Sequence, residues 1–341
     1  MHKFSGPLVA PAVFLILSCT GCPIDPFGLS EEQIVIASYN MQNLFDDVSQ
    51  GSEYPEYDPE RGEWGREAYA AKLSSMAEII RRLEPRPDII LVQEVENRAV
   101  LMRLAEEYLP LRDYDFTAVP EAEGAAVQTG VLSSLPFRNL LTHRAGGTPG
   151  ERYILELEFD LEGEELVLFN CHWKSRLGGA EATEAERVLA AKLVARRIEE
   201  LTRNRADLNV ILAGDLNCDP YRPLRGTQPA LAAVDSTPAL APVIWVVEPG
   251  EGYPQGSLCL SSGWKGIGAG GSYRYGGLWE RIDHLLWNAP LNDGRGWDVV
   301  DFELWDAPLA LDEWGAPLSF DAEGLTGYSD HLPLIIRLEK P

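Results

Sequence analysis

Short apolar runs alternate with segments of helical periodicity along most of the chain. The apolar runs predict buried strands, because aliphatic and β-branched residues follow one another there without a polar break. These strands cover residues 34–40, 88–92, 127–132, 153–159, 165–170, 208–213, 282–287 and 334–338.

Helical periodicity separates several of the strands. In residues 69–83, apolar side chains recur at steps of three and four, which places them on one face of a helix that ends before Pro85. Two further helices are predicted over residues 98–108 and 181–203, whereas the density of Gly, Pro and Ser predicts long loops in 219–280. Strands mixed with helices throughout indicate the α/β class.

The chain divides into three parts by composition. Residues 1–22 have a short basic start and then an apolar run that is too short to stay in a bilayer as a spanning helix, which indicates a signal peptide. Residues 23–33 carry prolines and a glycine and are expected to form a tether. No second compositional change follows, so residues 34–341 are predicted to form a single layered domain.

The cysteines near the amino terminus indicate a lipoprotein-type signal. Cys22 follows the small pair Thr20-Gly21, which resembles the bacterial site where a cysteine becomes the lipidated new amino terminus. Cys19 is an alternative processing site, and a cleaved secretory signal without a lipid is a second alternative. In each case we expect the mature protein to act outside the cytoplasm, anchored at the cell envelope or in the periplasm, or secreted.

The formal net charge of −24 limits the function classes. An acidic surface repels polyanions and offers no basic stripe, which argues against a tight, sequence-reading nucleic-acid binder. A turnover enzyme that holds phosphate only at a local site remains compatible with this charge. The other cysteines, Cys171, Cys218 and Cys259, show no zinc-ligand spacing, and we expect free buried thiols, with a Cys171–Cys218 disulfide as an alternative.

Polar side chains gather at the ends of the predicted strands. Any one of them has a structural explanation as a helix cap or a turn residue. Taken together, they indicate a shared crevice, because strand ends are where side chains of an α/β sheet converge. These residues are Asn40, Glu94, His172, Asp215, Asn217, Asp283, Asp330 and His331.

This set of side chains suits metal-assisted hydrolysis of a phosphoester. Glu94, Asp330 and Asn40 supply the oxygen ligands that Mg²⁺ prefers. Histidines can donate hydrogen bonds to phosphate or move a proton near neutral pH, and Asp283 is a candidate to orient one of them. The sequence has no nucleophile elbow, P-loop or dinucleotide fingerprint, so water is the expected nucleophile.

Six segments, in the same order, resemble the endonuclease/exonuclease/phosphatase superfamily, which includes pancreatic deoxyribonuclease, abasic-site endonucleases, neutral sphingomyelinases and inositol polyphosphate 5-phosphatases. The segments are SYNMQNLF (38–45), DIILVQEVEN (88–97), NCHWKSR (170–176), GDLN (214–217), IDH (282–284) and SDHLP (329–333). The resemblance implies a four-layer α/β/β/α sandwich of two packed mixed sheets, with the active site at one edge.

The resemblance also implies roles in binding the metal and activating water. It makes Glu94 the main metal ligand, with Asn40 nearby and Asp330 supporting the metal region. It has Asp215 orient or deprotonate the attacking water. Mg²⁺ is the expected ion, with Mn²⁺ or Ca²⁺ as alternatives.

A second group of implied roles concerns the phosphate. His172 is expected to bond the scissile phosphate, and Asn217 to stabilise the crowded transition state. Asp283 is expected to orient His331, which contacts the phosphate as a donor. Metal and donors together would stabilise the developing negative charge.

Segments flanking these motifs resemble secreted bacterial nucleases of the superfamily. Lys174, Arg176 and Arg187 are candidates for binding flanking phosphates, although each is equally compatible with a solvated surface charge. Tyr273 or Tyr275 is a candidate to stack on a base or sugar, with packing as the alternative for both tyrosines. Gln128 stands where many relatives carry Asp or Asn, which puts a substrate-side contact in doubt.

We therefore expect an exported, metal-dependent phosphodiesterase that hydrolyses DNA or RNA, acting as a monomer without a protein partner. An alternative keeps the fold and mechanism but changes the substrate to a phospholipid, an inositol phosphate or another phosphomonoester. A third interpretation is an inactive surface lipoprotein that uses the sandwich for binding. The complete catalytic set argues against the third, since a degenerate relative would be expected to lose Glu94, Asp215 or His331.

Overall fold

The computed structural model describes residues 33–340, except 63, 123, 148–149, 221–229, 232–243, 250–257 and 269. Residues from Gln33 onward form one compact unit. The expected signal peptide, its cysteines Cys19 and Cys22, and the tether up to residue 32 lie outside the described residues. Among the helices that the structure does describe, none is long and apolar enough to span a bilayer.

The first sheet has six strands in the order β15-β16-β1-β2-β4-β3. Their bounds are β1 Gln33–Leu44, β2 Ile89–Val95, β3 Phe116–Ala118, β4 Gln128–Ser133, β15 Asp298–Leu304 and β16 Leu334–Glu339. Strands β1 and β2 are parallel and the other neighbours are antiparallel, so the sheet is mixed.

The second sheet has eight strands in the order β5-β6-β7-β8-β14-β11-β10-β9. Their bounds are β5 Phe137–His143, β6 Ile154–Leu161, β7 Glu164–His172, β8 Asn209–Asp215, β9 Ala230–Leu231, β10 Ile244–Val247, β11 Cys259–Ser261 and β14 Asp283–Trp287. Strands β7 and β8 are parallel, as are β10 and β11, so this sheet is mixed as well.

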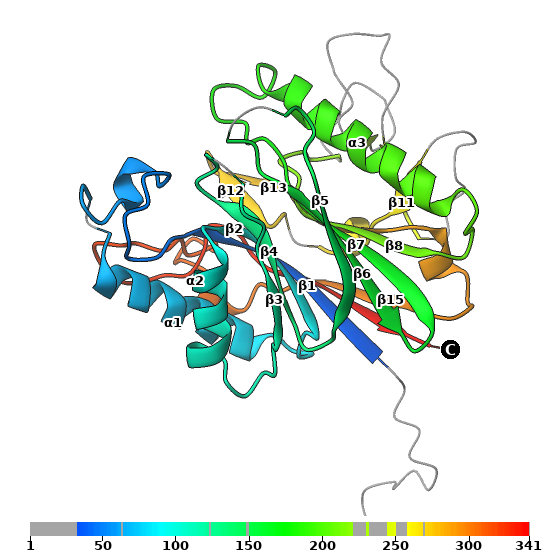
Figure 1. Cartoon of the computed structure of the whole chain (residues 1–341), viewed down its shortest axis with the longest axis horizontal. Coiled ribbons are helices and arrows are strands. Elements are labelled where there is room, and N and C mark those ends of the chain that lie inside the picture. Colours follow the sequence, from blue (N-terminus) through cyan, green and yellow to red (C-terminus); the bar gives the residue numbers. More distant parts are fainter. Residues whose placement is uncertain are drawn as a thin grey trace, which may run out of the picture. The chain divides into compact units, whose positions relative to one another are not determined.

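Helices lie on the outer face of each sheet (Figure 1). Helix α1 (Arg66–Arg82) and helix α2 (Arg98–Arg103), which continues as the π-helix η2 (Leu104–Tyr108), accompany the first sheet, and α3 (Glu184–Thr202) covers the second. Short 3₁₀ turns complete the set: η1 Pro55–Tyr57, η3 Trp264–Gly266, η4 Ala289–Asn292 and η5 Pro308–Ala310. The predicted four-layer sandwich is confirmed.

The core shows why the strands are apolar throughout. Along β8, Val210 and Leu212 pack with the cluster under α3, whereas Ile211 and Ala213 belong to the cluster between the two sheets. Because side chains of a strand alternate between faces, a strand buried on both faces must be apolar at every position. This explains the continuous runs from which the strands were predicted.

Residues 219–280 differ from the prediction of long loops. Within its described part, this region forms β10, β11 and a separate two-stranded hairpin of β12 (Tyr273–Tyr275) and β13 (Leu278–Glu280). Gly276 and Gly277 join the hairpin strands with φ of 56° and 83°. Consecutive left-handed residues form the tight turn that suits a hairpin, so these glycines mark a turn within a sheet and not a long loop.

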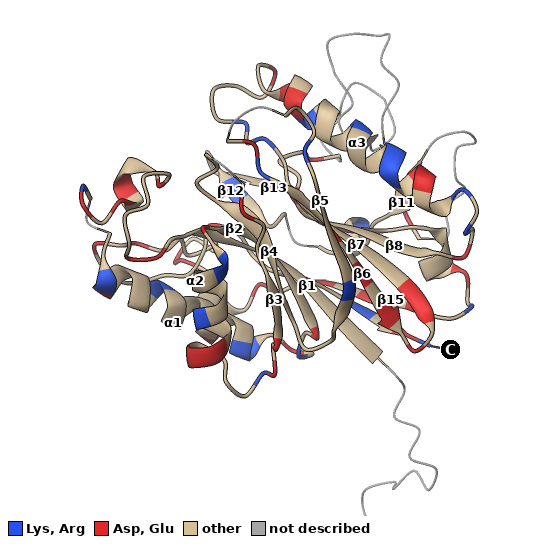
Figure 2. Cartoon of the chain, viewed as in Figure 1, with Lys and Arg blue, Asp and Glu red and all other residues tan. Residues whose placement is uncertain are grey.

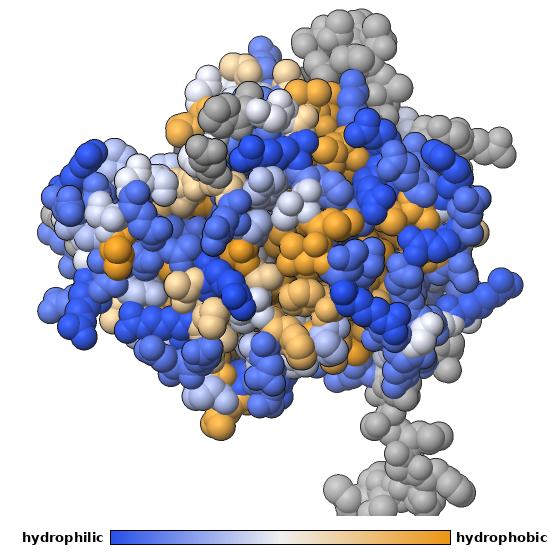
Figure 3. Space-filling model, viewed as in Figure 1, coloured by the Kyte–Doolittle hydropathy of each residue, from blue (hydrophilic) through white to orange (hydrophobic). Residues whose placement is uncertain are grey.

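The distribution of charged and apolar side chains over the surface agrees with the expectation that the protein has no basic stripe. Figure 2 shows Lys and Arg distributed over α1, α2 and α3 and not aligned in a single stripe on this face of the described chain. Figure 3 shows apolar side chains there in patches separated by hydrophilic ones. An anionic ligand would therefore have to be held by local contacts, for which the polar residues at the strand ends are the candidates.

Candidate active site

Asn40 joins the two sheets at the edge where their strands end. Its Nδ2 lies 3.2 Å from Oε1 of Glu94, on β2 of the first sheet, and 3.2 Å from Oδ2 of Asp215, at the end of β8 in the second. Its Oδ1 accepts the backbone N–H of Gln42 at 3.0 Å. Three of the eight residues predicted to share a crevice therefore lie together, with the Asn40 amide between two carboxylates.

Strained backbone surrounds this amide. Four of the non-glycine residues with positive φ lie in these strand-end segments: Gln42 at 48°, Asn43 at 56°, Glu94 at 61° and Asn217 at 48°. The pairing of β1 with β2 shifts register between Asn40 and Leu44, which is a bulge that re-aims these side chains. Such conformations cost of order 1–3 kcal/mol each and persist where function requires them.

The GDLN segment needs its glycine. Gly214 has a φ of 116°, and a Cβ there would lie 1.9 Å from the carbonyl oxygen of Cys171 on the neighbouring strand. Close approach of β7 and β8 brings His172 level with Asp215. The backbone N–H of Asn217 donates to Asp215 Oδ1 at 2.9 Å, so the segment fixes its own carboxylate.

His172 faces both carboxylates and an arginine that the sequence analysis missed. Its Nε2 lies 3.5 Å from Glu94 Oε1 and 3.5 Å from Asp215 Oδ2. Nη1 of Arg152 lies 2.6 Å from its Nδ1. Burial, together with the charges of Arg152 and His331, lowers the pKa of His172 well below its ordinary value, so this imidazole is neutral.

His331 is held in the opposite state. Its Nδ1 lies 2.7 Å from Oδ2 of Asp283, and Ser272 Oγ donates to the same oxygen at 2.6 Å. Burial alone would lower the pKa of His331, but the charges of Asp283 and Asp330 outweigh it and raise that pKa well above its ordinary value. The site therefore contains one imidazolium and one neutral imidazole, a division that assigns acid and base roles.

The carboxylates repel one another. Burial, followed by the charge of Asp330, raises the pKa of Glu94, and burial, followed by the charge of Asp283, raises that of Asp215 to about 7. Buried oxygens that resist ionisation together are those that a divalent cation would stabilise.

Two groups of possible ligand atoms fit such an ion. Glu94, His172 and Asp215 form one group and Asp215, Asp283 and His331 the other, each with its ligand atoms within 4.8 Å of one another. Oδ1 of Asp283 is buried without a hydrogen-bond partner, which leaves one carboxylate oxygen available. The donor set is rich in oxygen, as Mg²⁺ requires.

Asp330 lies at the margin of the cluster. It belongs to neither group of ligand atoms, and its Oδ1 is 3.9 Å from His331 Nε2. Its backbone N–H donates to Gln42 Oε1 at 3.1 Å, and Ser329 Oγ donates to the carbonyl of Asn40 at 2.8 Å. These bonds hold the SDHLP segment against β1.

Lys72 binds the backbone of the residue that precedes the SDHLP segment. It is fully buried on α1, and its Nζ donates to the carbonyl of Tyr328 at 2.6 Å. Burial lowers the pKa of Lys72 to about 7, even though Asp330 and Glu94 oppose the shift. A lysine three residues after Tyr69, within the apolar face of the predicted helix, was the signal that could have identified it.

A sequence signal for Arg152 existed as well. It directly precedes the strand predicted over residues 153–159, whose observed form, β6, pairs antiparallel with β7. The start of β6 must therefore lie beside the end of β7, which carries His172. Within the part of the chain that the structure describes, Arg152 forms no salt bridge, so its charge is uncompensated by a contacting carboxylate.

The residues that were predicted to contact the substrate lie in different environments. Tyr273 lies in the site, with its ring centroid 4.7 Å from that of His331 at an interplanar angle of 31°. Arg176 pairs with Glu280, with Nη1 3.2 Å from Oε1, and Lys174 is exposed. These three remain candidates for contact with the substrate.

The prediction for Arg187 is corrected by the structure. Its side chain is buried, and its guanidinium donates to Glu184 at 2.7 Å, to Thr183 Oγ1 at 2.8 Å and to the carbonyl of Lys174 at 3.0 Å. A guanidinium whose donors are occupied inside the protein has none left for phosphate. Arg187 instead ties the first turn of α3 to the loop after His172.

Gln128 and the cysteines have structural positions. Gln128 is buried, and its Oε1 accepts the backbone N–H of Tyr153 at 3.4 Å, which helps to place the adjacent Arg152. No disulfide joins Cys171 to Cys218, so that alternative is not observed among the residues that the structure describes.

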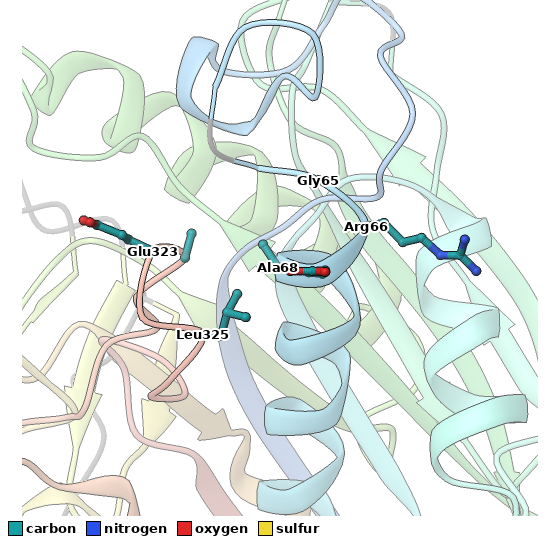
Figure 4. A pocket seen from close by; sticks show the side chains of 7 residues that line it. Gly65, Arg66, Ala68, Glu323 and Leu325 are labelled. Atoms are coloured by element: carbon teal, nitrogen blue, oxygen red, sulfur yellow. The ribbon is translucent and has the colours of Figure 1, made fainter.

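A surface cavity of about 450 Å³ lies apart from this cluster, between the start of α1 and residues 322–325. Figure 4 shows the Arg66 and Glu323 side chains pointing away from each other on its two sides, with Ala68 and Leu325 between them. Its lining residues include none of the predicted catalytic residues. The strand-end cluster is therefore the better candidate site.

Comparison with known proteins agrees with this geometry. The model of a family described as "Endonuclease/Exonuclease/phosphatase family" matches residues 35–340, nearly all of the compact unit. No curated protein matches the sequence closely enough to be reported as a relative.

Solved structures share the fold at low identity. Truncated TDP2 from Caenorhabditis elegans has a TM-score of 0.57 at 16% identity and covers 90% of this chain and 98% of its own. An endonuclease/exonuclease/phosphatase family protein from Bacteroides thetaiotaomicron has a TM-score of 0.53 at 18% identity, covering 90% and 98%. TDP2 from D. rerio, solved with a single-strand DNA product, has a TM-score of 0.54 at 17% identity, covering 91% and 100%.

Proposed function

The chain belongs to the endonuclease/exonuclease/phosphatase family, whose members are metal-dependent phosphoester hydrolases, and from this premise we propose that it hydrolyses phosphodiester bonds of DNA or RNA. The observation that carries the proposal is the arrangement around Asp215. This buried carboxylate lies between a neutral imidazole, His172, and the Asp283–His331 pair, whose imidazole is protonated.

A divalent cation, which we propose to be Mg²⁺, fits the carboxylate end of the cluster. Glu94 would be its main ligand, with Asn40 beside it and Asp330 at the margin. When bound, such an ion supplies positive charge to phosphate oxygens and lowers the pKa of water.

Asp215 is placed to accept the proton of the attacking water. Its pKa of about 7 suits a general base near neutral pH, because a base works best when its pKa is close to the working pH. The Asn217 backbone N–H and the Asn40 amide hold its two oxygens in a fixed orientation. His172, being neutral, does not compete for the negative charge of Asp215.

Three donors are placed to hold the phosphate as negative charge develops. His331 is kept protonated by Asp283, which binds its Nδ1 and leaves Nε2 as the donor to a phosphate oxygen. The Asn217 side chain donates to the carbonyl of Trp173 at 3.3 Å, just past the ends of β7 and β8 in the second sheet. Arg152 brings a permanent cation, and on substrate binding its guanidinium would exchange His172 for a phosphate oxygen.

Several features favour nucleic acid as the substrate. Tyr273 offers a ring beside His331, and Lys174 and Arg176 lie on the loop that follows His172. The structure of D. rerio TDP2 holds a single-strand DNA product, so the shared fold can accommodate nucleic acid. A net charge of −24 does not oppose turnover, because weak retention of an anionic product speeds its release.

The amino-terminal sequence further supports export, which we propose together with a lipid anchor on Cys22. Cys22→Ala should move the protein from the membrane fraction to the soluble fraction of the producing cells, while Cys19→Ala should leave it at the membrane. Membrane retention of the Cys22→Ala protein would contradict anchoring at this cysteine.

The decisive experiment is an assay of the purified protein with Mg²⁺, Mn²⁺ or Ca²⁺ against plasmid DNA, RNA, sphingomyelin and inositol phosphates. We expect cleavage of DNA or RNA that a chelator abolishes and that the Asp215→Ala protein lacks. If both nucleic acids survive while a lipid or a phosphomonoester is cleaved, the substrate proposal is wrong and the alternative substrate class replaces it. Chelator-resistant turnover would remove the metal-dependent mechanism.

A further inference from the structure

The β12–β13 hairpin carries apolar side chains into solvent next to the site. Tyr275 is 71% exposed and Leu278 is 65% exposed, and they face each other across the hairpin as a register pair. Large apolar groups exposed together on a short, ordered hairpin form a contact surface for a ligand more readily than isolated surface residues do.

The base of this hairpin is fixed to the catalytic histidine. Tyr273 forms a backbone bridge with His331 in addition to the ring contact. Ser272 bonds the Asp283 carboxylate, and its carbonyl accepts the backbone N–H of Leu332 at 2.9 Å. The hairpin therefore keeps a constant position relative to the phosphate-binding groups.

Strand geometry sets the direction of the exposed pair. Side chains at i and i+2 of a strand lie on the same face, so Tyr275 is on the face of Tyr273, whose ring contacts His331. Cross-strand partners share a face as well, which adds Leu278. The spacing from Tyr273 to Tyr275 is about 6.7 Å along the strand, so the pair lies one step outward from the site.

We propose that Tyr275 and Leu278 form a subsite for one unstacked nucleobase beside the scissile phosphate, and that the enzyme therefore prefers single-stranded nucleic acid. This inference rests on the proposed function. An aromatic ring next to an aliphatic side chain accepts the flat face of any base, as in single-strand binding grooves. A base paired within a duplex does not expose that face.

The charge of the hairpin favours a polyanion over a membrane. Arg274 and Arg281 outnumber Glu280 in the segment, and Glu280 is itself paired with Arg176, so the hairpin is locally cationic in an acidic chain. Arg274 also donates to the carbonyl of Trp314 at 3.1 Å, which supports the hairpin from its other face. Two apolar side chains cover about one base, whereas membrane insertion requires a larger apolar surface.

The test compares three substrates of one length: a single-stranded oligonucleotide, the same sequence within a duplex, and a strand in which tetrahydrofuran residues replace the bases. Each is made as DNA, and the first two also as RNA, and kcat/KM is measured for wild type, Tyr275→Ala, Tyr275→Phe and Leu278→Ala. Leu111→Ala is the matched control, because Leu111 is 87% exposed and lies in the turn that Arg112 ties to Arg81, away from Glu94.

We expect wild type to cleave the single strand faster than the duplex. Tyr275→Ala should lower kcat/KM on the single strand about tenfold, as expected for loss of a stacked base, and leave the base-free strand unchanged. Tyr275→Phe should retain most activity, Leu278→Ala should show a smaller loss, and Leu111→Ala none. Unchanged melting temperatures would show that the variants are folded.

Other outcomes overturn the inference in distinguishable ways. Equal losses on the based and base-free strands, or equal rates on single strand and duplex, would show that the hairpin reads no base while the proposed function stands. Loss of binding to phosphatidylcholine vesicles in Tyr275→Ala, with cleavage unchanged, would assign the pair to a membrane surface. Absence of cleavage of all three substrates by wild type would overturn the proposed function itself.

Discussion

Two clusters in this protein contain the same three kinds of side chain, but one attaches a helix to a sheet and the other lies in the candidate site. Each has a carboxylate that is largely or fully buried, an imidazole and a guanidinium. They are Glu94, His172 and Arg152 in the candidate site, and Glu156, His143 and Arg197 between β6 and α3.

The cluster under α3 is satisfied. Arg197 binds both oxygens of Glu156 at 2.8 Å, and His143 Nε2 lies 2.7 Å from one of them. Although burial raises the pKa of Glu156, these two partners outweigh it and lower the pKa to about 2. A carboxylate whose charge is stabilised in the fold attaches the helix to the sheet.

The carboxylate in the site accepts hydrogen bonds from Asn40 and the backbone N–H of Asn43 but has no contacting cation. Arg152 contacts His172 and not Glu94, and burial raises the pKa of Glu94 without a contacting cation to oppose it. The comparison shows that residue types do not decide the role of a buried cluster; the partner that each guanidinium contacts decides it. Where charge is left without a partner, a cation or a phosphate can supply one.

Replacing the carboxylate at the centre of the site by its amide should have the largest effect. Asp215→Asn keeps the shape but removes the proton acceptor, and we expect kcat to fall on the order of 10³–10⁴-fold. Its melting temperature should stay the same or rise, because repulsion with Asp283 disappears. Retention of a tenth of the wild-type kcat on DNA or RNA would exclude Asp215 as the base.

Replacing Glu156 by glutamine, the corresponding change in the cluster under α3, should lower stability and leave kcat nearly unchanged. Glu156→Gln leaves the half-buried Arg197 with only the more distant carboxylate of Glu200, and we expect unfolding by urea to show a loss of about 3 kcal/mol, as for a broken buried pair. The kcat at 25 °C should remain within about twofold of wild type, because the described side-chain hydrogen bonds and ion pairs of Glu156 go to His143 and Arg197 and not to the site. A stability equal to wild type would show that Glu156 does not attach α3.

The fold and most of the site could be predicted because both depend on short-range patterns. Apolar runs predict strands that are buried on two faces, and polar residues at their ends converge because β1–β2 and β7–β8 are parallel pairs. Asn40, Glu94, His172 and Asp215 each follow such a run, and the structure brings them together.

What could not be predicted depends on tertiary contacts. Arg187 has the sequence context of a surface helix residue, and only the packing of the 174–184 loop against it makes it structural. Arg152 enters the site through the pairing of β6 with β7, and Lys72 through a carbonyl 256 residues away. Their positions beside or within apolar patterns mark Arg152 and Lys72 as unusual, but periodicity does not identify their distant partners.

Replacing Arg152 or Arg197 should have an effect of intermediate size. Arg152→Met removes a cation from the site, and we expect kcat/KM to fall about 100-fold, equivalent to about 2.7 kcal/mol of transition-state stabilisation. The free energy of unfolding should be unchanged, because Arg152 forms no salt bridge among the described residues.

Arg197→Met is the matched control for Arg152→Met. It should lower stability as Glu156→Gln does and leave kcat/KM intact at a temperature where the variant is folded. A loss of stability in Arg152→Met as large as in Arg197→Met would show that the two clusters do not differ in kind.

The smallest expected effect is a difference in the pH dependence of stability without metal. The pKa of Asp215 is raised from 3.8 to about 7 in the fold, so its contribution is most favourable below pH 3.8 and is lost as pH rises through 7. The pKa of Glu156 is lowered from 4.5 to about 2, so its contribution is present above pH 4.5 and is lost as pH falls through 2.

Urea unfolding in chelator, at pH 5 and pH 8, should therefore show wild type losing about 2.5 kcal/mol more than Asp215→Asn over this interval. Subtracting the variant cancels the titrating groups that do not interact with Asp215. Saturating Mg²⁺ should abolish the difference, because a bound cation keeps the carboxylates ionised at both pH values. The free energy of unfolding of Glu156→Gln should change with pH as that of wild type does between pH 5 and pH 8. The two pH dependences should differ only in more acidic solution. If Glu156→Gln also diverged from wild type within the neutral interval, the Glu156 carboxylate would be titrating there, and the contrast between a carboxylate with a contacting cation and one without would fail.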